Sequence, residues 1–321
     1  MFADLPPSLA VWALAGLCVA LMGFAIQRGA TCTVAAIDEV VNKRRATRLA
    51  SLLEASAWVA GGLLVVQHLQ GKAPASGGYA LGAGTVAGAV LLGLGAYVNR
   101  ACVFGAIARL GSGEWAYVAT PLGFYLGCLS LRALLRDVEA RPLSEGSALL
   151  AAPAGLAWLF VAFVFWRGFG VLRARAWSAH AATIVIAITF LATLLLAGAW
   201  AYTDVLAQLA SGMANNVVER TALLLCLLGG ALWGGRTAAR WRAAWPSATA
   251  WARCLIGGVL MGWGSMLIPG SNDGLILLGL PLLWPYAWVS FAAMCATIAL
   301  AMLIARRWSW SGQNSCPPRA P

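Results

Sequence analysis

The sequence predicts an all-α polytopic membrane protein, and three observations support this fold class. Hydrophobic residues make up 61% of the chain, charged residues only 10%, and the mean hydropathy is +0.79. Soluble domains carry about 25% charged residues, so the composition is that of a membrane protein. The apolar runs are roughly 18–22 residues long and do not alternate, which favours helices over a β-barrel. The 36 glycines suit membrane helices that pack closely.

About nine apolar runs are long enough to cross a membrane as helices. They lie at 9–27, 51–69, 79–98, 116–135, 149–166, 181–201, 219–235, 251–268 and 284–305. Four shorter apolar pieces lie at 31–42, 101–110, 204–214 and 272–281. Pieces of this length, each after a glycine, proline, charged or polar break, are typical of re-entrant helices. Such backbone is tolerated at membrane depth only where it is packed in protein or lines a cavity.

The order of these segments predicts an inverted repeat. A span, a short helix and a second span follow one another twice before the run 149–166 and twice after it. Five spans precede residue 181, and because five is odd the second half must enter the membrane in the opposite sense. We expect a first half at 1–148, a connecting span and cytoplasmic loop at 149–180, an inverted second half at 181–308, and a disordered tail at 309–321.

The basic residues predict the orientation. The net charge of +11 does not indicate nucleic-acid binding, because the 22 Lys and Arg residues lie in short loops between spans. With the N-terminus outside, 17 of them fall on the cytoplasmic side and five on the outer side. We therefore expect a multi-pass protein of the bacterial inner membrane, N-terminus outside and C-terminus cytoplasmic. The first run lacks a preceding basic stretch and is interpreted as a retained span.

Two segments share a pattern in which an apolar run ends at an arginine and a cysteine follows. Residues 24–36 contain Arg28 and Cys32, and residues 96–108 contain Arg100 and Cys102. Each cysteine opens a short helix, whose N-terminus presents unpaired N–H groups and the positive end of a dipole. Aimed at the membrane midplane, such ends favour an anion, and the arginines add positive charge.

A thiol at a helix break has two interpretations. It is a weak donor with a soft, polarizable sulfur, which suits the terminal sulfur of thiosulfate better than sulfate. The alternative is that both cysteines are small packing residues, as we expect for the scattered Cys18, Cys128, Cys226, Cys254 and Cys295. No CxxC motif occurs and no histidine lies near a cysteine pair, so we expect no metal site and no cofactor.

A third break lies at 262–274, where Pro269 and Gly270 interrupt the span. Ser271, Asn272 or Asp273 can cap the short helix that follows. An acid inside the apolar part of a membrane protein is a functional candidate, so capping and function are both open for Asp273. At the fourth break we expect Asp204 to cap a helix. His68 and His180 have no carboxylate neighbour in sequence, and we assign them no role.

Most of the chain resembles the YeeE/YedE family of membrane proteins. The resemblance rests on the Arg-Gly-Ala-Thr-Cys break that ends at Cys32, on Gly262 through Pro281, and most specifically on the block from Asn99 to Gly113. It implies an hourglass-like fold and a thiosulfate path lined by cysteines, with Asn99, Asn272 and Asp273 beside it. Cys32 and Cys102 match two of the path cysteines. Ser271 stands where a third is expected, and its hydroxyl suits an oxygen better than a sulfur.

The resulting hypothesis is a permease, not an enzyme, for thiosulfate or a related sulfur anion. By analogy with the family, a small cytosolic sulfur-carrier protein is an expected partner. One alternative is a membrane sulfurtransferase in which Cys102 carries a persulfide, which requires an activated thiolate. Others are a scaffold that recruits a soluble sulfur enzyme, or an importer of sulfite or a persulfide. The sequence specifies neither the driving force nor the oligomeric state.

Overall fold

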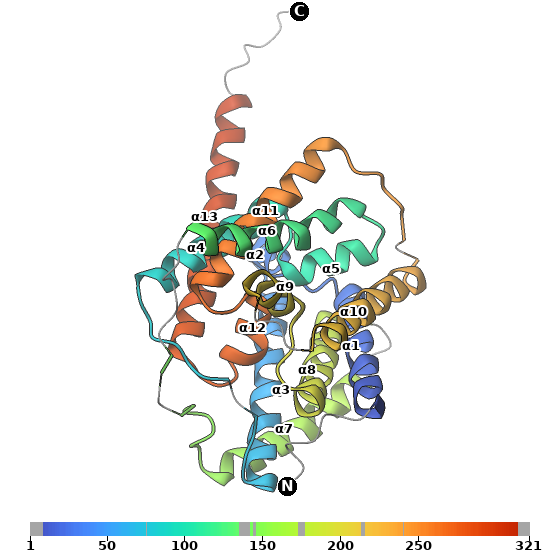
Figure 1. Ribbon diagram of the computed structural model, residues 1–321, viewed down its shortest axis with the longest axis vertical. Coiled ribbons are helices and arrows are strands. Elements are labelled where there is room, and N and C mark those ends of the chain that lie inside the picture. Colours follow the sequence, from blue (N-terminus) through green and yellow to red (C-terminus); the bar gives the residue numbers. More distant parts are fainter. Residues whose placement is uncertain are drawn as a thin grey trace, which may run out of the picture.

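The computed structural model describes residues 9–74, 76–134, 142–143, 146–172, 177–212, 216–239 and 241–313. Within these residues the fold is helical, and β structure is confined to two isolated bridges, Tyr79 with Pro142 and Glu114 with Ala244. The helices cross one another at varied angles around a centre where several short helices begin (Figure 1). The all-helical fold class is therefore confirmed.

The helices follow one another in two groups separated by α7. The first half consists of α1 (Leu9–Gly29), α2 (Thr33–Lys43), α3 (Thr47–Gln70), α4 (Ala83–Asn99), α5 (Val103–Gly111), the 3-10 turn η1 (Trp115–Val118) and α6 (Ala119–Leu134). The connecting helix α7 spans Ala154–Leu172. The second half consists of α8 (Ala179–Ala197), α9 (Tyr202–Ser211), α10 (Val217–Thr237), α11 (Ala248–Leu267), α12 (Asn272–Gly274), the π-helical turn η2 (Leu275–Gly279) and α13 (Pro285–Gln313).

Six helical stretches of the described residues are long and apolar enough to cross a membrane. They are Leu9–Lys43, Thr47–Gln70, Ala83–Gly111, Ala179–Ala197, Val217–Thr237 and Pro285–Arg307. A seventh is formed if α11 and the following Asn272–Gly279, bent by 52°, count as one span. The protein is thus a multi-pass membrane protein, whereas the count of nine spans stays a prediction, because α6 and the apolar part of α7 are shorter. Helix α13 continues to Gln313, and the rest of the predicted tail lies outside the described residues.

The helix contacts come in pairs related by exchange of the two halves. The comparison matches α1 with α8, α3 with α10, α4 with α11 and α6 with α13. Helix α1 packs against α10, and its counterpart α8 packs against α3. Helix α4 packs against α13, and its counterpart α11 packs against α6. The short helices follow the same rule, since α2 contacts α3 and α13 while α9 contacts α10 and α6. At the centre α1 packs against α8, and α4 against α11. This arrangement brings the N-terminal ends of α2, α5, α9 and α12 together.

The crossing of α4 and α11 depends on glycine. A Cβ atom on Gly95 would lie 2.7 Å from the Gly257 carbonyl oxygen, and one on Gly257 would lie 2.7 Å from the Asn99 Cβ atom. Small residues allow such close approach of backbones in a membrane, where dispersion and not water exclusion holds helices together. The close crossing fixes Asn99, and with it the break that follows α4, against the second half.

Candidate substrate path at the helix breaks

Two breaks of the first half have the same backbone geometry. At the first, Ala30 is left-handed (φ 46°) and the Thr31 N–H donates to the Ile26 carbonyl at 3.1 Å. At the second, Arg100 is left-handed (φ 59°) and the Ala101 N–H donates to the Ala96 carbonyl at 3.1 Å. These are helix ends closed by a left-handed residue, a conformation that a non-glycine residue adopts at a cost of about 1 kcal/mol or more.

The cysteine follows the left-handed residue by two positions in both breaks and becomes the N-cap of the next helix. Cys32 caps α2 (φ −161°, ψ 127°) and Cys102 caps α5 (φ −75°, ψ −178°). Ser271 caps α12 in the same extended conformation (φ −94°, ψ 179°). None of the three side chains makes a capping hydrogen bond. The thiols and the hydroxyl are therefore not engaged in satisfying the helix ends that they precede.

The two thiols are neighbours in the folded protein. Cys32 and Cys102 interact through their side chains, and both are free cysteines. Gly105 of α5 makes room for this contact, because a Cβ atom there would lie 2.5 Å from the Cys32 sulfur. Cys102 is fully buried, whereas Cys32 is 9% exposed. Cys32 therefore stands at the edge of the solvent-accessible region, and Cys102 stands behind it.

A hydrogen bond within each half ties its two short helices together. In the first half the Thr33 N–H of α2 donates to the Cys102 sulfur at 3.2 Å. In the second half the Thr203 Oγ1 atom of α9 lies 2.8 and 2.9 Å from the two carboxylate oxygens of Asp273. All four residues are buried.

Two further hydrogen bonds join the halves and close a ring. The Tyr202 hydroxyl of α9 donates to the Val103 carbonyl oxygen of α5 at 3.0 Å. The Asn272 amide of α12 donates to the Thr33 hydroxyl of α2 at 3.4 Å. Together the four contacts form what we call the N-terminal ring, in which α2, α5, α9 and α12 each bond two neighbours. A solute that crosses the centre of the protein has to pass this ring.

Two buried oxygens of the ring have no hydrogen-bond partner among the described residues. They are Ser271 Oγ, on a residue that is 0% exposed, and Asn272 Oδ1, on a residue that is 1% exposed. Most buried polar atoms in proteins are hydrogen-bonded, and leaving one unpaired costs about 1–3 kcal/mol. These atoms are therefore suited to bind a polar solute that replaces the missing partner.

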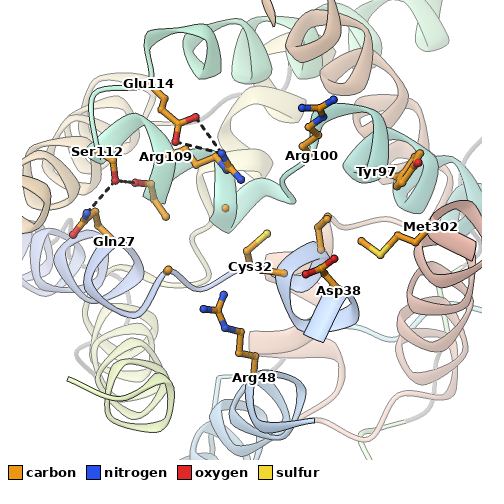
Figure 2. Close-up of a pocket in the computed structure, with 15 residues that line it drawn as sticks. Gln27, Cys32, Asp38, Arg48, Tyr97, Arg100, Arg109, Ser112, Glu114 and Met302 are labelled. Atoms are coloured by element: carbon orange, nitrogen blue, oxygen red, sulfur yellow. Dashed lines mark hydrogen bonds and ion pairs between the residues drawn. The ribbon is translucent and has the colours of Figure 1, made fainter. Parts of the chain in front are cut away.

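A cavity of about 530 Å³ reaches Cys32 from one side of the ring (Figure 2). Its lining comes mostly from α1, α2, α4 and α5 and includes Tyr97, Met302 and three arginines. Figure 2 shows Arg48 on one side of Cys32 and Arg100 and Arg109 on the other. The cavity is therefore a polar, positively charged vestibule with a thiol at its inner end.

The three arginines differ in what they contact. Arg109 forms an ion pair with Glu114 at 3.1 Å and lies over the Tyr117 ring at 5.4 Å. The guanidinium groups of Arg48 and Arg100 form no hydrogen bond or ion pair within the part of the chain that the structure describes. Unpaired guanidinium groups are strong donors for oxyanions, so these two residues are the free cations of the vestibule.

Two predicted residues lie elsewhere. Arg28 is absent from the cavity lining and lies over the Phe24 ring at 5.9 Å. Asn99 is fully buried; its amide donates to the Ala101 carbonyl at 2.8 Å, and its Oδ1 accepts from the Thr120 hydroxyl at 3.0 Å. Asn99 thus holds the second break in shape, whereas Cys32 and Arg100 line the vestibule.

A second cavity that touches the ring is much smaller. A cavity of about 20 Å³ lies among aromatic and apolar side chains, with Trp200, Tyr202 and Asp273 in its wall. Helix α9, which begins here, has Ala201 as its N-cap and carries Asp204 in its first turn. The expectation that Asp204 itself is the cap is therefore wrong, because the helix begins two residues before it.

Sequence reasoning missed a cluster that joins α3, α7 and α8. Glu54 accepts two hydrogen bonds from Arg167, at 2.7 and 3.1 Å, and also contacts the His180 ring. His180 therefore does have a carboxylate partner, 126 residues away in the sequence. A charged residue inside a predicted span was the available signal, since such a residue needs a partner.

Long apolar helices around buried helix breaks define a polytopic membrane transporter. The family model for sulphur transport matches the chain twice, over residues 28–173 and 164–300. The chain therefore belongs to this family of sulphur-compound transporters, which confirms the resemblance to the YeeE/YedE proteins. No curated protein matches the chain.

Proposed function

We propose that this protein is a permease for thiosulfate or a related small sulfur anion in the bacterial inner membrane. The observation that supports it most directly is the meeting of four helix N-termini, with Cys32, Cys102 and Ser271 as N-caps free of capping bonds. Each N-terminus contributes positive potential and unpaired N–H groups. The soft sulfur of a thiol suits the terminal sulfur of thiosulfate.

The path runs from the small cavity beside Asp273, past Ser271 and Cys102, to Cys32 and the vestibule. With the orientation that the basic loops favour, the vestibule opens to the cytoplasm, and the anion leaves past Arg48 and Arg100. The vestibule at Cys32 and the hydrogen bonds of the N-terminal ring support a state that is open on the vestibule side and closed at the ring. Along the ring, the thiols and the Ser271 hydroxyl can donate hydrogen bonds to the anion, whereas the Asn272 amide oxygen is an acceptor and cannot.

The repeat gives this path two access routes. Matched helix contacts and two matches of the same family model support two related halves, and the odd number of preceding spans supports opposite orientations. Transporters built in this way expose a central site alternately by rocking one half against the other. The difference in volume between the vestibule and the small cavity beside Asp273 supports one end state of such a motion.

The geometry favours transport over a sulfurtransferase that carries a persulfide on Cys102. A reactive cysteine is an accessible thiolate beside a cation. Cys102 is fully buried and accepts a backbone hydrogen bond, and unlike Cys32 it does not line the vestibule that contains the arginines. A mass increase of one sulfur atom on Cys102 after exposure to thiosulfate would favour the enzyme.

The test is sulfur nutrition in bacterial cells that lack other sulfate and thiosulfate uptake. Expression of the protein should allow growth on thiosulfate as sole sulfur source, and vesicles from these cells should take up ³⁵S-thiosulfate. Membrane insertion is checked with a C-terminal fluorescent tag. A well-inserted protein that supports growth on sulfite but not on thiosulfate would assign the path to another sulfur anion.

A further inference from the structure

The N-terminal ring contains a buried acid, Asp273, whose hydrogen-bond contacts are compatible with a protonated carboxyl group. Asp273 is buried, and one hydroxyl, that of Thr203, lies within hydrogen-bond distance of both its oxygens, at 2.8 and 2.9 Å. A hydroxyl has one proton and can donate to one oxygen at a time. The second contact is fully satisfied when the Asp273 oxygen itself carries a proton and donates it to Thr203. The Gly274 N–H donates to the other oxygen at 3.0 Å.

Asp273 is not a member of the ion pairs seen in the described residues, which join Arg109, Arg167 and His180 to glutamates. The titratable groups that interact with Asp273 are Asp204 and Tyr202, both of α9. An isolated buried charge is costly, and two neighbouring carboxylates repel each other.

The nearest cation acts on the other carboxylate. Arg220 of α10 influences Asp204, and its guanidinium donates to the Gln208 side chain at 3.1 Å. The surroundings of the Asp204–Asp273 pair therefore contain one remote cation for two acids. At least one proton on the pair removes the repulsion, and Asp273 can hold it because the Thr203 hydroxyl can accept a hydrogen bond as well as donate one.

The position of Asp273 couples this proton to the anion path. It lies in the wall of the small cavity and follows Ser271 and Asn272, whose unpartnered oxygens are buried in the same turn. The Ser271 side chain faces the Asp273 carboxylate without making a hydrogen bond to it. An anion at this turn would be repelled by an ionised Asp273, whereas a protonated one is neutral and can donate a hydrogen bond.

We propose that Asp273 carries a proton that crosses the membrane together with the sulfur anion, so that the protein is a proton–anion symporter. This inference rests on the proposed function and adds its driving force. In each cycle the Asp273 carboxylate gains a proton from the outer side, the anion passes, and the proton is released on the inner side. One O–H bond forms and then breaks, and no other covalent bond changes.

The experiment uses the purified full-length protein in liposomes that contain a pH-sensitive dye, with the membrane potential clamped by potassium and valinomycin. Addition of ³⁵S-thiosulfate outside gives two readouts, anion uptake and lumen acidification. Thiosulfate is a suitable probe because near neutral pH it is fully ionised and brings no proton of its own. We expect wild-type uptake to acidify the lumen, and an inward proton gradient to drive accumulation.

The diagnostic variant is Asp273→Asn, which keeps the shape of the protonated side chain but cannot exchange a proton. We expect its anion uptake to occur without acidification and to lose its response to the proton gradient. The matched control is Asp38→Asn, which alters a vestibule acid that accepts a hydrogen bond from Asn42 and should keep the wild-type proton-to-anion ratio.

Each outcome is decisive for a different claim. Thiosulfate uptake by the wild type without proton movement would overturn the symport inference and leave the proposed function intact, even if the variant failed to insert. Acidification that persists in Asp273→Asn would remove Asp273 as the proton carrier. The absence of uptake of both thiosulfate and sulfite by well-folded wild type would overturn the proposed function and the inference with it.

Discussion

The two halves both begin their short helices at N-caps with extended backbone, but the side chains at these positions differ. The first half has thiols at its two N-caps, Cys32 and Cys102, and arginines around its cavity. The second half has Ala201 and Ser271 at the corresponding positions, with acids in the turns that follow. Under the proposed function, the thiols and arginines of the first half would contact the anion, whereas the Ser271 hydroxyl and the Asp273 carboxyl of the second half would contact an oxygen of the anion and the proton.

The largest effect should come from removing the buried thiol of the first half. We expect Cys102→Ala to reduce thiosulfate uptake by roughly a hundredfold or more, because the central soft contact and the partner of the Thr33 N–H are both lost. Uptake of ³⁵S-thiosulfate is measured at matched protein levels. Cys254→Ala is the control, since Cys254 is equally buried but lies in α11 away from the ring. Normal transport by well-inserted Cys102→Ala would show that the thiol is a packing residue.

A smaller effect on transport is expected when a positive charge is removed from the vestibule. Arg100→Gln should raise the KM for thiosulfate by about tenfold at low salt and less at high salt, because screening weakens the attraction. Glutamine keeps a long polar side chain at this left-handed position, so the backbone strain is similar and the charge is what changes. Arg45→Gln, an exposed arginine outside the cavity, should leave KM near the wild-type value. Equal KM values for the two variants would contradict a role of the vestibule in binding.

A still smaller effect on uptake is expected when the N-cap serine of the second half is replaced by cysteine, the residue at the N-caps of the first half. We expect Ser271→Cys to keep thiosulfate uptake within about threefold of wild type or to improve it, since thiol and hydroxyl are similar in shape and both are weak donors. The measurement is competition between thiosulfate and sulfate for uptake, in which the variant should shift the preference toward thiosulfate. A severe loss of uptake would mean that the Ser271 hydroxyl has a role of its own that a thiol does not replace.

The weakest effect on transport should come from the cluster that joins the halves. Glu54→Gln removes the charge that binds Arg167 of α7 and His180 of the second half, and we expect it to lower the free energy of unfolding by about 1–3 kcal/mol. Thermal unfolding in detergent measures the change. Glu114→Gln, which breaks an exposed pair with Arg109, should cost no more than about 0.5 kcal/mol. Equal losses would show that burial adds nothing to the Glu54 cluster.

Particular residues show how far the sequence predicts this structure. The positions of Cys32, Cys102 and Ser271 could be predicted because a helix break has local signals: a polar or glycine-containing interruption between apolar runs. Their partners could not, because Thr33 and Asn272 meet across 239 residues, a contact made by tertiary packing alone. The same holds for Glu54 and His180.

The number of membrane-spanning helices could be predicted only in part, because local sequence patterns do not specify it fully. The lengths of α3, α8 and α10 follow directly from their apolar runs, and the structure has them as full spans. The number nine depends on α6 and α7, which are short or only partly apolar in the described residues. Whether a short apolar helix crosses a bilayer depends on its neighbours and its tilt, which a run of residues does not specify.

The N-terminal ring is not equally strong against every motion. Its bonds from Thr33 to Cys102 and from Thr203 to Asp273 each stay inside one half, so they survive if the halves move as rigid bodies. The bonds made by Tyr202 and Asn272 cross between the halves and would have to break. Two hydrogen bonds contribute about 1 kcal/mol each, an energy that thermal fluctuation supplies readily. Tyr202→Phe would remove one of these two bonds and shift the balance between closed and open ring toward the open ring by about 1 kcal/mol.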